Sequence, residues 1–256
     1  GKGNYRLYQD QSGPPLGHVQ QVASLKGIEF FDVEDLAHFE ADLAAGYTAR
    51  YTFIEPCYGD IVHDTYEGGS SQHPMDGLAG GDRLAARIYN AIRNSPLWTS
   101  SLFVILYDEH GGFYDSVKPG AAVPPNDGAS ATLNASGFGF DIYGVRVPAI
   151  VVSPWVARGH VDQTVYDHSS IPATLARLLL AQGRVLHRLE GLDEFAPAVG
   201  IDGVVAGVNC SGDQRGALAC GNGVRHAQHQ RVAIRDYGQL HRLLLVVPLG
   251  HRHRRA

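Results

Sequence analysis

The sequence predicts an α/β fold in which a mostly parallel sheet is flanked by helices. Two short apolar runs, 102–106 and 147–152, contain β-branched residues and no charge, as strands buried on both faces do. Other segments have helical periodicity, such as the one in which Leu84, Ile88 and Ile92 follow each other at intervals of four. Alternating strands and helices are typical of layered α/β proteins.

The first part of the chain is predicted to contain a helix, a strand and a long loop. Residues 1–28 carry few periodic signals. Asp32 is the expected N-cap of a helix that Gly46 would end, because Asp favours the cap and Gly the C-terminal position. Its apolar face would hold Leu36, Phe39 and Leu43. A strand is expected over 51–54. The Gly-, Ser-, Asp- and His-rich residues 57–80 indicate a long loop, and such loops are often functional.

The next part is predicted to continue the alternation. An amphipathic helix is expected over 82–94, followed by the strand at 102–107. Residues 116–144 are rich in Pro, Gly, Ala and Asn, which predicts a second long loop. After the strand at 147–152, a helix is expected to start at 167–170.

Three residues suited to metal binding or proton transfer follow the strand at 102–107. Asp108, Glu109 and His110 come directly after it, and Gly111 allows the backbone to turn. Ligands of open α/β sheets bind beyond the carboxyl ends of the strands. Two adjacent carboxylates repel each other there unless a cation or protons neutralise them, and hard divalent cations take oxygen ligands. The pattern is therefore typical either of a cation site or of a solvated loop.

Composition narrows the classes of function. The net charge of −5 gives no electrostatic case for binding nucleic acid. No apolar stretch reaches the length of about 18 residues that a transmembrane helix needs. The N-terminus shows no basic-then-apolar pattern, so no signal peptide is expected in this chain.

Several short segments, in the same order along the chain, resemble one family. It is the bacterial phosphoesterase family of phosphatidylcholine-hydrolysing phospholipases C and related acid phosphatases, which share the alkaline-phosphatase-like fold. The segments are 51–56 (YTFIEP), 67–74 (EGGSSQHP), 90–98 (NAIRNSPLW), 107–115 (YDEHGGFYD), 146–154 (RVPAIVVSP) and 166–174 (YDHSSIPAT).

The resemblance implies roles for four residues. Asp108 and Glu109 would bind a divalent metal ion of open identity, which acts as a Lewis acid on a phosphate ester. His73 is similar to a family active-site histidine that binds phosphate or protonates the leaving alkoxide. His110 would be a further ligand, a phosphate contact or a residue that orients Asp108. The implied substrate is a phospholipid or a small phosphate ester, with contact at a membrane surface and a secreted or periplasmic location.

The sequence departs from the family pattern in two places, at its missing N-terminal motifs and in residues 186–256. Residues 1–185 are expected to form the C-terminal part of an N-terminally truncated catalytic domain, because no segment resembles the family's Glu-Asn-Arg-Ser-Phe-Asp run or its Ser or Thr nucleophile. Weak or no hydrolysis is therefore expected from this chain alone, and phospholipase C, acid phosphatase and inactive fragment stay open as alternatives. Residues 186–256 are expected to be a divergent basic tail, genuine or frame-shifted, and 196–256 to pack less well than 50–180.

Overall fold

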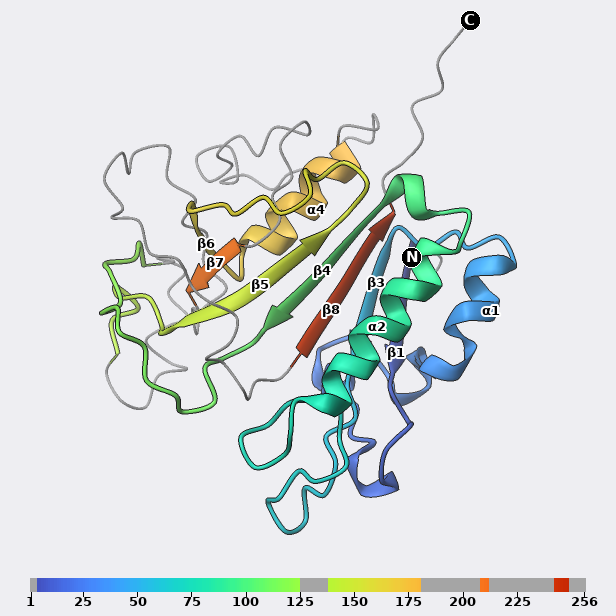
Figure 1. Cartoon of the computed structure of the whole chain (residues 1–256), viewed down its shortest axis with the longest axis horizontal. Coiled ribbons are helices and arrows are strands. Elements are labelled where there is room, and N and C mark those ends of the chain that lie inside the picture. Colours follow the sequence, from blue (N-terminus) through green and yellow to red (C-terminus); the bar gives the residue numbers. More distant parts are fainter. Residues whose placement is uncertain (1–3, 125–137, 181–207, 212–241, 249–256) are drawn as a thin grey trace, which may run out of the picture.

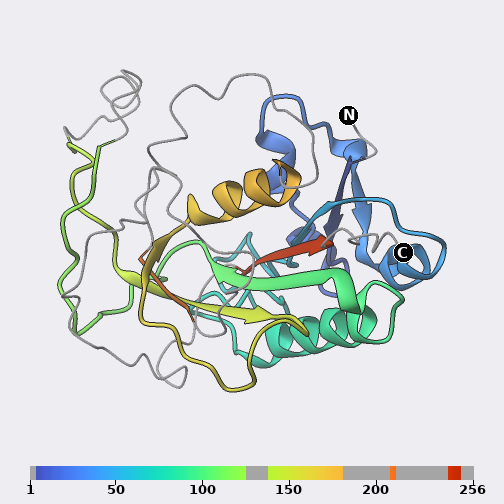
Figure 2. The same ribbon diagram turned by 90° about the horizontal axis from the view of Figure 1, so that it is seen from above.

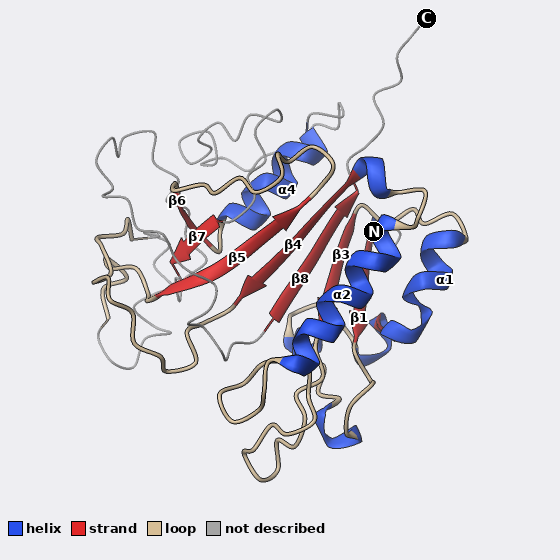
Figure 3. Cartoon of the chain, in the orientation of Figure 1, coloured by secondary structure: helices blue, strands red, loops and turns tan. Residues whose placement is uncertain are grey.

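The computed structural model of the chain describes residues 4–124, 138–180, 208–211 and 242–248. At its centre is an eight-stranded sheet with helices on both faces (Figure 1, Figure 3). In spatial order the strands are β2, β1, β3, β8, β4, β5, β7 and β6. Their bounds are β1 Tyr5–Gln9, β2 Val33–Asp35, β3 Tyr51–Glu55, β4 Ser101–Tyr107, β5 Arg146–Val152, β6 Val165–Asp167, β7 Val208–Ser211 and β8 Arg242–Pro248. The described α-helices are α1 Phe39–Ala44, α2 Ala79–Arg93 and α4 Ser170–Leu180.

The sheet is mixed: the α/β class is confirmed, and the expected parallel pairing is confirmed for β1 with β2 and β3. β1 pairs in parallel with β2 and β3, and β6 with β7. The four other pairings are antiparallel. In these, β8 pairs with both β3 and β4, and β5 pairs with both β4 and β7. A parallel return to the same sheet needs a crossover, usually through a helix. None of the described residues between β4 and β5 is helical, and β5 returns antiparallel to β4.

α1 and α2 cover one face of the sheet. The buried residues Leu84, Ile88 and Ile92 of α2 share a core cluster with Ile54 of β3 and Phe103 of β4. The period of four that predicted this helix is therefore the period of its buried stripe. Figure 2 shows α2 on one side of the strands and α4 on the other.

α4 packs on the opposite face. Its residues Ile171 and Leu175 contact a second core cluster formed mainly by β4 and β5. The buried strand residues of that cluster are Leu102, Val104, Leu106, Tyr107, Val147, Ala149 and Val151. β4 is buried along its whole length, as the apolar run predicted. Because both faces of β4 are covered, its carboxyl end is held rigidly in the middle of the sheet.

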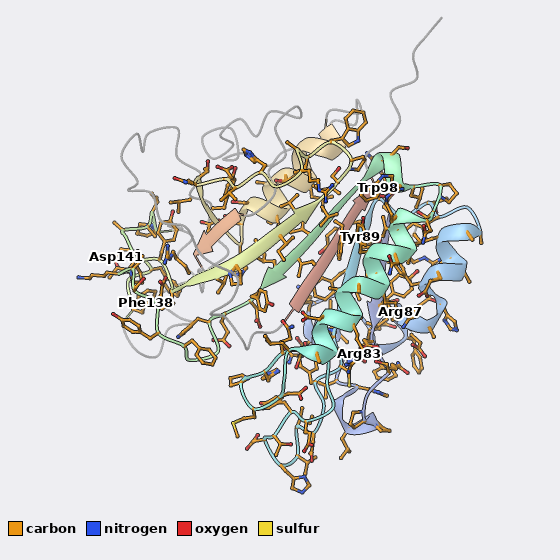
Figure 4. All side chains as sticks on the ribbon, viewed as in Figure 1. Arg83, Arg87, Tyr89, Trp98, Phe138 and Asp141 are labelled. Carbon is orange, nitrogen blue, oxygen red and sulfur yellow. The ribbon has the colours of Figure 1, made fainter. Side chains whose placement is uncertain are left out.

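Aromatic residues close the far end of α2. Trp98 packs against the core cluster on the α2 side, and its ring meets that of Tyr89 edge-on at 6.1 Å (Figure 4). The guanidinium of Arg93 lies over the Trp98 ring at 4.9 Å. These contacts fix the chain where it passes from α2 into β4.

The N-terminal segment differs most from the sequence prediction. β1 lies within residues 1–28, where the sequence carries few periodic signals and predicted no strand. Asp32 caps no α-helix, because its carboxylate accepts the backbone N–H of Glu29 at 3.0 Å and closes a 3-10 turn. The residues after it pair with β1 as β2. The helical segment starts only after Asp35, whose carboxylate accepts the N–H of Ala37 at 2.9 Å.

The expected tail contributes two strands to the sheet. β7 pairs with β5 and β6, and β8 lies between β3 and β4. β8 contains the apolar run 243–247, the part of the tail with a strand-like pattern. The rest of 186–256 lies outside the described residues, so the expected poor packing of the tail stays a prediction.

Candidate active site

The carboxyl end of β4 carries a tight polar turn. Tyr107, the last residue of β4, is buried, whereas Asp108 and Glu109 are exposed. Asp108 Oδ1 accepts the N–H of Glu109 at 3.0 Å, and Glu109 Oε2 accepts the N–H of Gly111 at 2.7 Å. Gly111 has a φ of 62°, in the left-handed region that glycine enters without strain. The two carboxylates therefore stand at the strand end, where the sequence predicted them.

His110 and Asp115 complete this turn. The half-exposed His110 has its Nδ1 3.5 Å from Glu109 Oε2. Further along, both carboxylate oxygens of Asp115 accept hydrogen bonds from Arg146 of β5, each at 2.6 Å. The segment that carries the candidate ligands is thus fixed to β4 at one end and to β5 at the other.

His73 lies in a buried aromatic setting at the end of the long loop. Its ring stacks on that of Tyr66, with centroids 3.6 Å apart and 6° between the planes. Tyr58 meets it edge-on at 5.9 Å, and Ser71 Oγ forms a hydrogen bond of 2.7 Å with Nδ1. Only 6% of the His73 surface is exposed. These contacts fix both the plane and the rotation of the imidazole ring.

One hydrogen bond brings the His73 loop to the end of β4. The Tyr107 hydroxyl donates to Gln72 Oε1 at 2.5 Å. Gln72 precedes His73 in the chain, and Tyr107 precedes Asp108. His73 and Asp108, 35 positions apart in the sequence, are thus each adjacent in the chain to one partner of this hydrogen bond.

His168 also reaches the end of β4. Its Nε2 lies 2.8 Å from the carbonyl oxygen of Tyr107. A carbonyl can only accept, so Nε2 carries the proton in this hydrogen bond. The sequence indicated no more than a helix start at this position, because the contact joins residues 61 positions apart.

Glu55 is a buried carboxylate that the sequence did not single out. It ends β3 and accepts hydrogen bonds from the Tyr58 hydroxyl and the N–H of Gln21, both at 2.9 Å. Burial raises the pKa of Glu55, and these hydrogen bonds oppose the rise only in part. Burial likewise raises the pKa of Tyr58, and the charges of Glu55 and Asp108 raise it further. The ends of β3 and β4 thus form one acidic neighbourhood.

Asp10 extends this row of strand ends to β1. Its buried carboxylate accepts the Ser70 hydroxyl at 2.6 Å and the N–H of Ser12 at 3.1 Å. Ser70 Oγ in turn accepts the N–H of Cys57 at 3.0 Å. This network ties both arms of the loop that carries His73 to the end of β1. The rule that singled out Asp108, an acid directly after a strand, also finds Asp10 once β1 is known.

A cavity of about 640 Å³ lies on the β1–β3 face beside these residues. Glu55, Tyr58 and Asp108 form its polar end. Its apolar lining includes Leu7, Val22, Leu25, Ile28, Phe53 and Leu175. Lining residues from Tyr51 to Glu55 on β3 give it a length of roughly 13 Å. A cavity of this size and polarity suits a ligand with an apolar body and a polar end near Asp108.

Asp108 and Glu109 offer the kind of ligand atom that a hard cation prefers, but too few of them to complete its coordination shell. Asp108 and Glu109 offer carboxylate oxygens, but such cations take about six. Across the part of the chain that the structure describes, no group of three or more His, Cys, Asp or Glu is placed to hold a metal ion. The two carboxylates by themselves do not form a complete metal site.

The comparisons with known proteins agree with the resemblance read from the motifs. Residues 11–179 match the model of the Phosphoesterase family. The chain belongs to this family. Non-specific phospholipase C6 of Arabidopsis thaliana is 42% identical over 181 residues, which cover 67% of this chain and 33% of that protein. Hemolytic phospholipase C of Pseudomonas aeruginosa is 36% identical over 115 residues, covering 41% of this chain and 16% of that protein.

Phosphoesterase relatives of this chain occur in both plants and bacteria, so its similarity is wider than the bacterial family that its motifs indicated. The chain spans about a third of the length of the plant relatives that it matches. No solved structure matches it significantly. Among the described helices, none combines the length and the apolar character that a bilayer span requires.

Proposed function

We propose that this chain supplies part of the active site of a phosphoric ester hydrolase of the phospholipase C type. The observation that carries the proposal is the Tyr107–Gln72 hydrogen bond, which brings the His73 loop to the strand end that presents Asp108. Membership of the phosphoesterase family and the names of the relatives support the same reaction class. The alkaline-phosphatase-like form of the α/β fold is part of this proposal.

His73 and the acidic strand end have complementary roles in the proposed reaction. A protonated His73 binds the phosphate or gives its proton to the leaving alkoxide. Asp108 and Glu109 would hold a divalent metal ion of open identity through their carboxylate oxygens. When bound, such an ion neutralises phosphate charge and polarises a phosphoryl oxygen. His110 is proposed to orient the acidic turn through its contact with Glu109.

The cavity favours a substrate with an apolar leaving group. Its polar end is shared with the candidate site through Asp108 and Tyr58, and the rest of its wall is mainly apolar. A phosphodiester of a lipid presents both chemistries, whereas a small phosphomonoester uses only the polar end. The proposed substrate is therefore a phospholipid. The same proposal includes peripheral contact with a membrane surface and a secreted or periplasmic location.

Hydrolysis assays test this function. Residues 1–256, and the longest natural polypeptide that contains them, are given a chromogenic phosphocholine ester and a chromogenic phosphomonoester, with and without chelator. We expect the longer polypeptide to hydrolyse the phosphocholine ester in a chelator-sensitive way and residues 1–256 to do so weakly or not at all. Asp108→Asn and His73→Gln should each lower kcat roughly a hundredfold or more.

The matched control is Glu34→Gln, a carboxylate change on the edge strand β2. It should leave kcat unchanged. Turnover that survives both Asp108→Asn and His73→Gln would show that the reaction takes place elsewhere. Strong turnover by residues 1–256 that Asp108→Asn abolishes would place the nucleophile within this chain.

A further inference from the structure

Tyr107 is held at both of its polar groups. Its hydroxyl donates to Gln72 Oε1 at 2.5 Å, and its carbonyl oxygen accepts the Nε2–H of His168 at 2.8 Å. The residue is only 7% exposed and belongs to the core cluster under α4. These contacts hold the Tyr107 side chain in a fixed position at the end of β4, an interior strand of the sheet.

Gln72 is the counterpart of Tyr107 on the loop. It is 1% exposed and has a φ of 61°, a left-handed conformation that is uncommon for residues other than glycine. Such a conformation persists when the surroundings determine it. Besides accepting from Tyr107, its amide donates to the carbonyl of Leu78 at 2.9 Å and to Asp82 Oδ1 at 3.2 Å. The side chain thus joins the loop to β4 and to the start of α2.

We propose that Tyr107 and Gln72 are positioning residues, whose hydrogen bond sets the placement of His73 relative to Asp108. The backbone conformation of Gln72 sets the direction of the chain at His73. The position of Tyr107, the last residue of β4, sets the position of Asp108. Neither residue needs to touch the substrate. The inference rests on the proposed function, in which His73 and Asp108 act on one phosphate group. Displacements of about 1 Å in such a pair lower rates roughly a hundredfold.

Tyr107→Phe tests the inference with little disturbance, because it removes one hydroxyl and keeps the ring and the carbonyl. Gln72→Asn is the second variant. Asparagine tolerates the left-handed conformation well, but its amide is one methylene shorter. The matched control is Tyr47→Phe, which removes a hydroxyl paired with Thr52 Oγ1 at 2.6 Å on the α1 side of the sheet. Thermal unfolding of all variants confirms that they fold.

The first measurement needs no activity. Diethyl pyrocarbonate modifies accessible histidines, and mass spectrometry of the peptide that contains His73 gives the rate for that residue. We expect the rate to rise several-fold in Tyr107→Phe and Gln72→Asn and to stay unchanged in Tyr47→Phe. An unchanged rate at His73 in both test variants would overturn the inference, whatever happens to hydrolysis.

The second measurement uses whichever polypeptide hydrolyses the phosphocholine ester. We expect kcat to fall about tenfold to a hundredfold in Tyr107→Phe, with little change in KM. The double variant should be no slower than the slower single variant, because both changes break the same hydrogen bond. Multiplicative losses, or a loss in KM alone, would refute a positioning role. Faster labelling of His73, together with no phosphoesterase activity in the longest natural polypeptide that contains residues 1–256, would support the positioning contact and reject the proposed function.

Discussion

Arg146→Met is expected to lower the free energy of unfolding by about 3–5 kcal/mol. Arg146 and Asp115 form a two-point ion pair, with both hydrogen bonds at 2.6 Å. Their side chains are 16% and 2% exposed. Removing the guanidinium leaves the Asp115 carboxylate buried without its counter-charge. Breaking one half of a buried pair is strongly destabilising for this reason.

The loss should depend on pH in a defined direction. Burial acts to raise the pKa of Asp115, but the hydrogen bonds from Arg146 and the N–H of Val117 outweigh it, and the pKa lies below its ordinary value of 3.8. A folded pKa below the unfolded one stabilises the protein at neutral pH, and this stabilisation is lost as pH falls through the folded pKa. The difference between the native protein and Arg146→Met should therefore shrink in acid.

Urea unfolding followed by circular dichroism measures both effects, at neutral pH and below the ordinary pKa of aspartate. Arg6→Met is the matched control, because Arg6 and Glu34 form an ion pair whose side chains are 47% and 37% exposed. It should change the free energy of unfolding by no more than about 1 kcal/mol. If Arg146→Met changes it no more than Arg6→Met does, the ion pair does not hold the acidic turn as described.

Three further predictions follow from other parts of the fold. Val22→Trp should fill the cavity and weaken the binding of long-chain alkylphosphocholines, by about fourfold for each methylene excluded, without changing short-chain binding. Calorimetric titration checks this, and Val62→Trp on an exposed loop is the control that should leave both unchanged. Burial raises the pKa of Tyr51 from 10.0 to about 12, so the free energy of unfolding should decrease as pH rises between these values. Tyr51→Phe has no phenol to ionise and should lack this contribution to the decrease. Hydrogen exchange should show 242–248 as protected as 102–107, because β8 is paired on both edges; fast exchange there would instead favour the sequence expectation of a poorly packed tail.

Elements with strong local patterns were predictable from the sequence. The apolar stripe of α2 and the run in β4 each reflect one local periodicity, and the structure confirms both. β1 was not predictable, because Arg6 and Gln9 interrupt its apolar pattern, although Gln9 is fully buried and donates to the carbonyl of Val19. The direction of β5 relative to β4 depends on a long connection that carries no periodic signal.

The candidate site divides in the same way. Asp108 and His73 could be proposed from the sequence because they stand in recognisable motifs, and Asp108 comes directly after a predicted strand. Glu55, Asp10 and His168 acquire their surroundings only when distant segments fold together. The partners of Glu55, for example, include the N–H of Gln21, 34 positions away. No local pattern encodes such a contact.

The antiparallel strand β8 acts as a spacer within the sheet. It separates β3 from β4, two strands that run in the same direction. Adjacent strands lie about 4.8 Å apart, so the ends of β3 and β4 stand roughly 9.6 Å apart. If the two strands were neighbours, Glu55 and the Asp108 turn would be brought to about half that separation, and their charges would repel more strongly. The separation between Glu55 and the Asp108 turn therefore depends on β8, a strand from the C-terminal part of the sequence.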